Sequence, residues 1–271
     1  MKLIESFIRS KYAHESGCED YLHVGENYVA VFDGATAKTA TTIRGMSMGR
    51  FITQRLGGFL ETANAGLSGA ALAQAMTDCI ADEITTLETA NGNLQEGPSA
   101  SVAVYALCSR TITVVGDAQC MVNGCTLTRP KRIDTLLSEV RSVYTRLLME
   151  QLGEKFQPQD DPGRQVILPV LKLQYLLQNN ESFGDYGYGC INGKPVPQRF
   201  VEVYEVQPGD EVILCTDGYP EPAATLHAAE KALHADLESD PLRIFSHAST
   251  KGLLGEQFVS FDDRVYVRFV A

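Results

Sequence analysis

Acidic residues stand at the ends of apolar, strand-like runs at five places in this chain. Asp33-Gly34 stops the run YVAVF, and Asp217-Gly218 stops the run VILCT in the same way. The other three places are Glu19-Asp20, Gly116-Asp117 and Asp262-Asp263. A carboxylate at the end of a buried strand is costly unless something neutralises it. Each place taken singly reads as a strand followed by a turn, but together they predict acids gathered at one edge of the fold.

Carboxylates that converge repel one another unless they are protonated or bind cations. Oxygen ligands without His or Cys suit the hard cations Mg²⁺ and Mn²⁺ rather than Zn²⁺. Two such ions about 3.5–4 Å apart would bridge a water, lower its pKa and orient a phosphate for in-line attack. The five acidic places therefore predict metal-assisted hydrolysis of a phosphate ester.

The composition excludes several other classes of protein. The chain has 271 residues and a net charge of -11, with no basic tract, so we expect no nucleic-acid partner. Its 7 cysteines are odd in number and contain no CxxC pair, which argues against disulfides or a thiolate zinc site and favours a reducing cytoplasm. Charges interrupt the N-terminal run MKLIESFIRSKY, and no apolar run approaches about 20 residues. We expect a cytoplasmic protein without a signal peptide or membrane span.

Strands that alternate with helices must position these acids. Apolar runs bounded by turn residues predict strands at residues 3–8, 28–33, 100–108, 111–115, 119–122, 199–205, 211–216 and 265–270. Helical spacing predicts helices at 39–57, 68–90, 131–153, 166–178 and 222–235, and a short one at 241–247. Tight turns join the strands between 100 and 122, which indicates an antiparallel meander. This order predicts the α+β class, with sheets packed together and helices outside.

Residues 179–197, NNESFGDYGYGCINGKPVP, are dense in turn-forming types. They predict a long ordered loop, and loops of this length are often functional. Lys131 and Arg132, at the start of the helix predicted before it, are interpreted as solvated residues.

The ordered set ED, VFDG, VVGDAQ, VILCTDG and DDRVYVRF resembles the metal-dependent (PPM) serine/threonine phosphatases of type 2C. The resemblance runs from about Cys18 to Val270, in the family's order and near its spacing. It implies a four-layer αββα sandwich, two antiparallel sheets flanked by helices, with a two-metal site at one end. It further implies one catalytic domain over residues 1–271, with the family's flap at 131–197. In this chain the flap region carries a helical insert near 131–178.

The resemblance also implies ligands for two Mg²⁺ or Mn²⁺ ions. Glu19 would ligate one ion, Asp33 would bridge both, and the carbonyl of Gly34 would bind one. Asp217 and Asp262 would ligate the other ion. The attacking nucleophile would be the bridging water.

Three further acids take indirect or weaker roles by the same resemblance. Asp20 and Asp263 would act through water molecules. Asp117 matches the position that can join Asp217 in a weaker third metal site.

The sequence departs from the family at two positions. Relatives often follow the first Asp-Gly with His and two glycines, where the His helps to protonate the leaving group, but here Ala35-Thr36-Ala37 follows. Many relatives place an Arg four residues before the first metal-binding Glu, where it holds the substrate phosphate, and here that residue is Glu15. Lys38 is the candidate replacement as a phosphate contact, and His14 is the second. The alternative for Lys38 is a solvated lysine at a helix start.

The leading hypothesis is a Mg²⁺- or Mn²⁺-dependent phosphatase that acts on phosphoserine or phosphothreonine in a phosphoprotein substrate. One alternative keeps the site but gives it a small phosphorylated metabolite, which the absent Arg would permit. A second is a pseudophosphatase, a binding module on the same fold that regulates a partner. The sequence carries no signal of oligomeric state.

Overall fold

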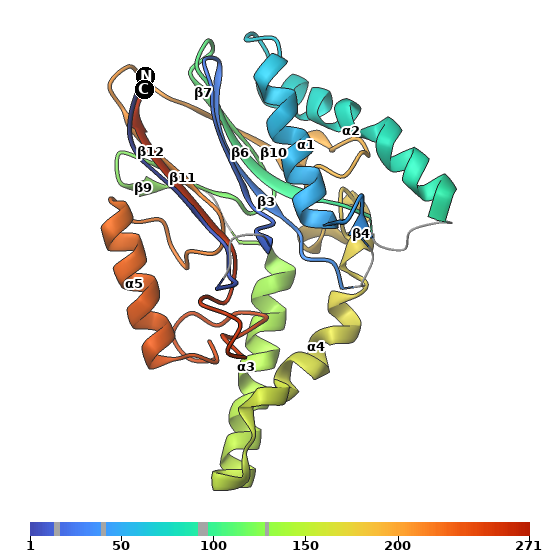
Figure 1. Ribbon diagram of the computed structural model, residues 1–271, viewed down its shortest axis with the longest axis vertical. Coiled ribbons are helices and arrows are strands. Elements are labelled where there is room, and N and C mark those ends of the chain that lie inside the picture. Colours follow the sequence, from blue (N-terminus) through green and yellow to red (C-terminus); the bar gives the residue numbers. More distant parts are fainter. Residues whose placement is uncertain (14–16, 39–41, 92–96, 128–129) are drawn as a thin grey trace.

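The computed structural model describes residues 1–13, 17–38, 42–91, 97–127 and 130–271, and two five-stranded sheets form its centre (Figure 1). One sheet consists, in spatial order, of β1 (Lys2–Arg9), β12 (Arg264–Val270), β11 (Glu211–Cys215), β8 (Gln119–Val122) and β9 (Cys125–Thr126). The other consists of β10 (Val201–Glu205), β7 (Thr111–Val115), β6 (Ala100–Ala106), β3 (Tyr28–Gly34) and β2 (Tyr21–Val24). All neighbouring strands in both sheets pair antiparallel.

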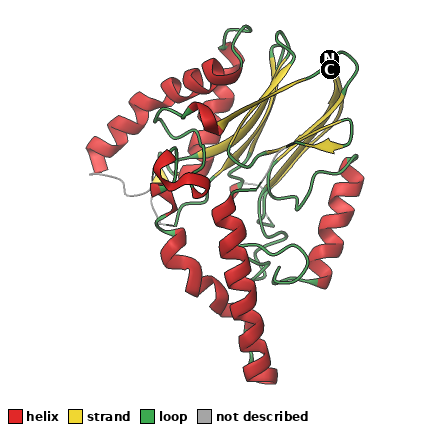
Figure 2. Cartoon of the chain, turned by 180° about the vertical axis from the view of Figure 1, so that it is seen from behind, coloured by secondary structure: helices red, strands yellow, loops and turns green. Residues whose placement is uncertain are grey.

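Helices cover the outer faces of both sheets. The helices α1 (Met48–Thr62) and α2 (Gly69–Asn91) lie on the sheet that contains β3, and α5 (Leu226–Ser239) lies on the other sheet (Figures 1 and 2). Buried apolar side chains from both sheets fill the space between them. The predicted α+β fold, a four-layer αββα sandwich with two antiparallel sheets flanked by helices, is confirmed.

The apolar run of strand β3 is continuous because both faces of the strand are covered. Val29 and Val31 face the layer between the sheets, whereas Tyr28, Ala30 and Phe32 face the helices. All five are fully buried, because successive side chains of a strand point to opposite faces and both faces are covered here. The run ends where Asp33 reaches the end of the sandwich.

The helix predicted at 39–57 begins later and ends later than expected. Helix α1 begins at Met48, and residues before it form a small hairpin of β4 (Thr42–Ile43) and β5 (Met46–Ser47), while 39–41 lie outside the described residues. Gly57 was predicted to end the helix, but α1 continues through it to Thr62. A Cβ at Gly57 would lie 2.3 Å from the ring of Tyr21, so this glycine serves close packing rather than termination.

The predicted meander of 100–122 is wrong in its third strand. Strands β6 and β7 pair as expected, but β8 leaves that sheet and pairs with β11 in the other. The chain crosses between the sheets at Gly116-Asp117. Gly116 has φ +92°, and a Cβ there would lie 2.3 Å from Oγ of Ser101, so only glycine fits this crossing. The crossing places Asp117 between the two sheets.

The short helix predicted at 241–247 is absent from this part of the described chain. The carboxylate of Asp240 accepts the backbone N–H groups of Ile244 at 2.8 Å and Phe245 at 2.7 Å, and Arg243 has φ 52°. These side-chain hydrogen bonds hold the segment as a loop, because they take N–H groups that a helix would use. The preceding helix, predicted at 222–235, is α5 and begins four residues later.

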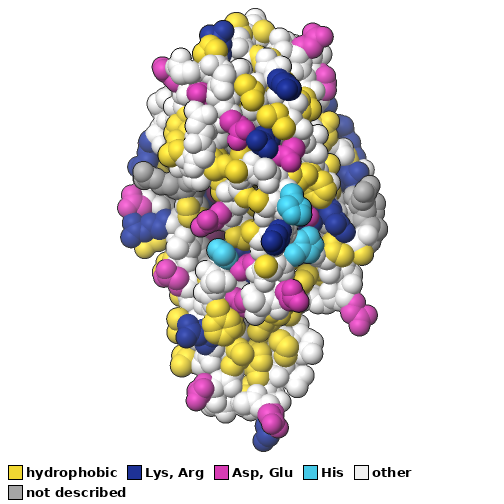
Figure 3. Space-filling model, turned by 90° about the vertical axis from the view of Figure 1, so that its left-hand side faces the viewer, with side chains coloured by type: hydrophobic (Ala, Val, Ile, Leu, Met, Phe, Trp, Pro, Cys, Tyr) yellow, Lys and Arg dark blue, Asp and Glu magenta, His cyan; other side chains and the backbone are white. Residues whose placement is uncertain are grey.

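The helical insert predicted near 131–178 is an arm that projects from the end of the sandwich (Figures 1 and 2). It consists of α3 (Arg132–Leu152) and α4 (Pro162–Leu171), and Pro169 lies inside α4. Short 3₁₀ turns occupy Gly153–Lys155, Pro158–Asp160, Gln174–Leu176, Glu181–Tyr186 and Gln198–Phe200. Hydrophobic side chains gather on the arm, and Val143 and Leu147 are 55% and 63% exposed (Figure 3).

A buried arginine fastens this arm to the loop that follows α5. Arg141 is fully buried, and its guanidinium binds Asp161 through Nε at 3.0 Å and Nη2 at 2.9 Å. Nη1 donates to the backbone carbonyls of Leu242 and Ser249, both at 3.0 Å. The two-pronged pair stabilises the base of the arm against the loop, because a planar guanidinium matches a carboxylate in two parallel hydrogen bonds.

All seven cysteines are free, as their spacing predicted. None of the helices in the described ranges has the length and apolar character that crossing a membrane requires.

Truncation of a side chain between the sheets tests the packing of the sandwich. Leu214 of β11 is fully buried in this layer, so Leu214→Ala should lower the free energy of unfolding by about 2–5 kcal/mol. The matched control is Leu3→Ala, because Leu3 of β1 is 42% exposed and should lose no more than about 0.5 kcal/mol. Urea denaturation measures both, and equal losses would contradict the assigned layer.

Candidate active site

The acids predicted from the sequence lie around one cavity at the end of the sandwich. The cavity has a volume of about 730 Å³, and Asp33, Asp117, Asp217 and Asp262 line it. Glu19, Asp20 and Asp263 are buried at 4%, 6% and 2% exposure. The sequence-based grouping of these acids is therefore reproduced by the fold, with four acids on the cavity wall and three more deeply buried.

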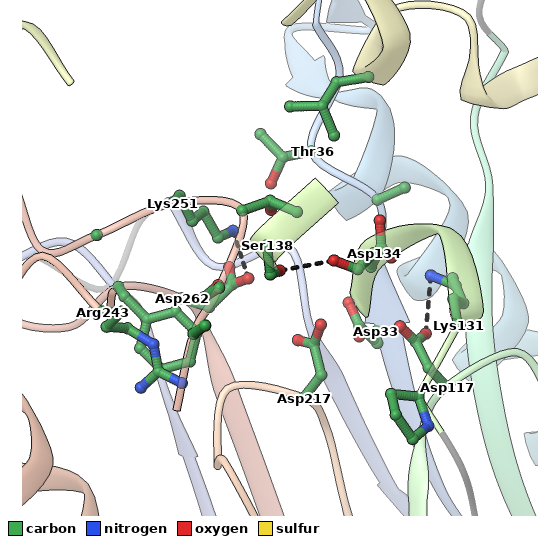
Figure 4. A pocket seen from close by; sticks show the side chains of 18 of the residues that line it. Asp33, Thr36, Asp117, Lys131, Asp134, Ser138, Asp217, Arg243, Lys251 and Asp262 are labelled. Carbon is green, nitrogen blue, oxygen red and sulfur yellow. Dashed lines mark hydrogen bonds and ion pairs between the residues drawn. The ribbon is translucent and has the colours of Figure 1, made fainter. Parts of the chain in front are cut away.

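Each acid is placed by the end of a strand. Asp33 stands near the end of β3 in one sheet, and Asp217 follows β11 in the other, so the two carboxylates approach from opposite sheets. In Figure 4, Asp217 lies between Asp262 on one side and Asp33 and Asp117 on the other. Gly34 fits only as glycine, because a Cβ there would lie 2.4 Å from the carbonyl oxygen of Glu19.

Two aspartates at the centre of the site have no ion-pair partner in the part of the chain that the structure describes. Among the described residues, neither Asp33 nor Asp217 forms an ion pair. Burial, together with the charges of Asp217 and Asp20, raises the pKa of Asp33 well above its ordinary value. Burial, together with Asp262 and Asp117, raises the pKa of Asp217 to about 7. The centre of the site therefore favours a bound cation or a proton.

The acids around this centre are neutralised by lysines. Nζ of Lys131 lies 2.8 Å from Asp117, and Nζ of Lys251 pairs with Asp262. Burial alone would raise the pKa of Asp262, but Lys251 and Lys11 hold it at about 2. Within the described part of the chain, no three acidic, His or Cys side chains are already arranged as a ligand shell.

Asp20 and Asp263 form hydrogen bonds beneath the cavity. Asp20 accepts from the hydroxyl of Thr216 at 2.7 Å. Asp263 accepts from the backbone N–H of Lys11 at 2.7 Å and that of Glu19 at 3.0 Å. These contacts fix the segments that carry the outer acids. Their predicted action through water stays a prediction.

The ion pairs of Lys11 and Lys131 with the acids were not predicted from the sequence. Lys11 was not singled out in the sequence, yet its side chain is 6% exposed and its Nζ lies 3.1 Å from Glu19. Lys131 was interpreted as solvated, which is wrong, because its side chain is 19% exposed and its Nζ also lies 5.0 Å from the ring centre of Tyr188. One signal for the position of Lys11 was present in the sequence. Lys11 follows the first strand and Asp262-Asp263 precede the last, so antiparallel pairing of these two strands would bring them together.

The proposed phosphate contact, Lys38, lines the cavity, and its Nζ donates to the carbonyl of Thr36 at 2.5 Å. His14 and Glu15 lie outside the described residues. Other cationic side chains on the cavity wall were not predicted: Arg164, Arg243 and Lys251. The cavity thus combines acids that suit a cation with bases that suit an anion.

The fold is that of the metal-dependent (PPM) serine/threonine phosphatases. The catalytic domain of the serine/threonine phosphatase PstP, solved with two manganese ions, matches with a TM-score of 0.50 at 14% identity over 100% of both chains. PstP/Ppp from Mycobacterium tuberculosis gives a TM-score of 0.49 at 15% identity over 98% of this chain and 97% of its own. PppA from Pseudomonas aeruginosa gives 0.48 at 13% identity over 100% and 99%. At these identities the likeness concerns the fold.

No protein-family model matches the sequence, and no curated protein matches it either.

Removing one central charge should stabilise the metal-free protein at neutral pH. The pKa of Asp217 is raised from 3.8 to about 7, so the folded form holds this proton more tightly than the unfolded chain. The resulting stability is complete below about pH 4 and is lost as the pH rises through about 7. Between about pH 5 and about pH 8, wild type should lose about 2 kcal/mol more than Asp217→Asn, whose amide does not titrate.

Urea denaturation in EDTA at the two pH values measures this difference. Asp78→Asn is the control, because Asp78 is an exposed residue of α2 and should behave as wild type. Equal losses for wild type and Asp217→Asn would show that the central charges do not repel.

Proposed function

We propose that this protein is a Mg²⁺- or Mn²⁺-dependent phosphomonoesterase that hydrolyses phosphoserine or phosphothreonine in proteins. The observation that carries the proposal is the pair Asp33 and Asp217, half-buried carboxylates from opposite sheets that form no ion pair among the described residues. The fold shared with PstP, whose crystal structure holds two manganese ions, supports the same function.

The donor set at this centre fits a hard divalent cation. The available donors are carboxylate and carbonyl oxygens, which Mg²⁺ and Mn²⁺ prefer, and the raised pKa values of Asp33 and Asp217 indicate a deficit of positive charge. Asp33, Asp217 and Asp262 would hold the ion, together with the carbonyl of Gly34. When bound, such an ion supplies a Lewis acid that lowers the pKa of water and takes up charge from the phosphate.

The residues of the chain bind and orient the phosphate in this proposal. Lys38, Arg164 and Lys251 bring positive charge to the wall of the cavity that also carries the acids. Lys251 is 26% exposed at its side chain, so it can turn from Asp262 towards an incoming phosphate. Positive side chains around a phosphoryl group stabilise the charge that moves on to its oxygens during transfer.

A histidine on the cavity wall can replace the proton donor that the motif lacks. His247 lines the cavity, and its Nδ1 lies 2.8 Å from Oδ1 of Asp236. Asp236 is itself fixed by Arg243 at 2.8 Å. A carboxylate that holds one ring nitrogen orients the imidazole and leaves the other nitrogen for proton transfer. We assign His247 as the acid that protonates the leaving group.

Metal dependence tests the proposed activity. Hydrolysis of p-nitrophenyl phosphate and of a phosphothreonine peptide should require Mn²⁺ or Mg²⁺ and stop in EDTA. Asp33→Asn and Asp217→Asn should each lower turnover by about 10²-fold or more, because each removes a ligand of the ion. The matched control, Asp78→Asn on the exposed face of α2, should retain wild-type turnover.

Turnover that survives EDTA, or full activity in both central variants, would contradict this function. Mn²⁺ binding without turnover of either substrate would favour a binding module on the same fold. Turnover of small phosphorylated metabolites but not of phosphopeptides would favour a metabolite phosphatase, which the absent arginine would permit.

The role of His247 can be separated from that of the ion by the choice of leaving group. His247→Asn should lower turnover of the phosphothreonine peptide by about 10²-fold, because an alkoxide leaving group needs a proton. It should change turnover of p-nitrophenyl phosphate by less than about tenfold, because nitrophenolate leaves without one. His227→Asn, an exposed position on α5, is the control. Equal losses on both substrates would contradict proton donation by His247.

A further inference from the structure

The ammonium group of Lys11 lies among the acids of the site. Nζ of Lys11 is 3.1 Å from Glu19, 3.4 Å from Asp263 and 3.5 Å from Asp262, and it donates to the hydroxyl of Thr36 at 2.9 Å. These partners come from three separate segments of the chain. Two of them, Glu19 and Asp262, are acids that the sequence motifs assigned to different metal ions.

The fold holds Lys11 in this place. Its backbone N–H donates to Asp263 at 2.7 Å, and its carbonyl accepts from the N–H of Val259 at 2.8 Å. The preceding strand β1 is in register with β12, with Arg9 opposite Arg264. With 6% of its side chain exposed, Lys11 cannot turn towards solvent as Lys251 can.

The contacts of Lys11 use the oxygens that a second ion would need. A lysine ammonium has three N–H donors, and Glu19, Thr36 and the Asp262-Asp263 pair receive them here. The same Oε2 of Glu19 also accepts from the hydroxyl of Thr36 at 2.5 Å. An ion placed beside Glu19 would meet a fixed positive charge at close range, and like charges in a buried site repel strongly.

We propose that Lys11 is a built-in cation that takes the place of one of two divalent ions. The protein then binds a single Mg²⁺ or Mn²⁺ ion, on the side of Asp33 and Asp217, and Glu19 is a partner of Lys11 instead of a metal ligand. This inference rests on the proposed function for the ion at Asp33 and Asp217. The number of ions bound is a separate claim that the proposed function does not make.

The number of ions bound by the full chain tests this inference without any assay of turnover. Protein freed of metal with EDTA is titrated with MnCl₂, and bound Mn²⁺ is counted by calorimetry and by the electron paramagnetic resonance signal of free Mn²⁺. Wild type should bind one ion. Lys11→Met, which keeps the length of the side chain without its charge, should bind two.

Three further variants make the count specific. Lys11→Arg keeps the positive charge and should bind one ion. Lys38→Met removes a lysine from the wall of the same cavity and should also bind one. Glu19→Gln in the wild-type background should leave the single ion and its affinity within about threefold, whereas a ligand change costs about 10–100-fold in affinity.

Two ions in wild type would overturn this inference and leave the proposed function standing. A single ion in a folded Lys11→Met protein, or a tenfold loss of affinity in Glu19→Gln, would also overturn it. If wild type binds no Mn²⁺, the proposed function fails together with it. Should Lys11→Met not fold, as judged by circular dichroism, the counts for wild type, Lys11→Arg and Glu19→Gln still decide.

Discussion

The structure depends on the cost of bringing several carboxylates together at the buried end of a two-sheet sandwich. Each of these groups loses water when the strand ends converge, and each lies within reach of the charges of the others. The protein offsets that cost unevenly. Lys11, Lys131 and Lys251 neutralise Glu19, Asp117 and Asp262, whereas burial and neighbouring carboxylates leave Asp33, Asp217 and Asp20 with raised pKa values. This imbalance is the basis for the cation that we propose at the centre of the site.

The same constraint explains the architecture around the site. The central carboxylates come from different sheets, and the crossing between the sheets at Gly116 brings Asp117 to the same cavity. The loop after α5 must stay at the cavity mouth, since it carries Lys251 and His247. Arg141 fixes this loop by binding its carbonyl groups from the base of the arm. The arm therefore supports the site indirectly, because it holds the backbone of the loop after α5 in place.

Local patterns in the sequence were sufficient for eight of the strands and for the acids at their ends, but not for the short strands β2, β4, β5 and β9. Each predicted strand lies within two residues of an observed one, because a buried run must stop where Asp33 or Asp217 meets the end of the sandwich. Contacts between distant segments were not accessible in the same way. The crossing at Gly116 depends on its approach to Ser101, and the place of Lys11 depends on Asp263, 252 residues further along. The periodicity of apolar residues indicates which side chains are buried, but it does not indicate which distant residues they contact.

Lys11 lies just after β1, so its positive charge is covalently tethered to the protein. An ion in solution occupies a site according to its concentration, whereas a tethered group is present at a local concentration set by the geometry of its attachment. The acids around Glu19 thus keep their counter-charge however scarce divalent ions become. That counter-charge is lost only if the edge strand β1 separates from β12, so local opening of this edge would expose the acids and remove their cation in one step.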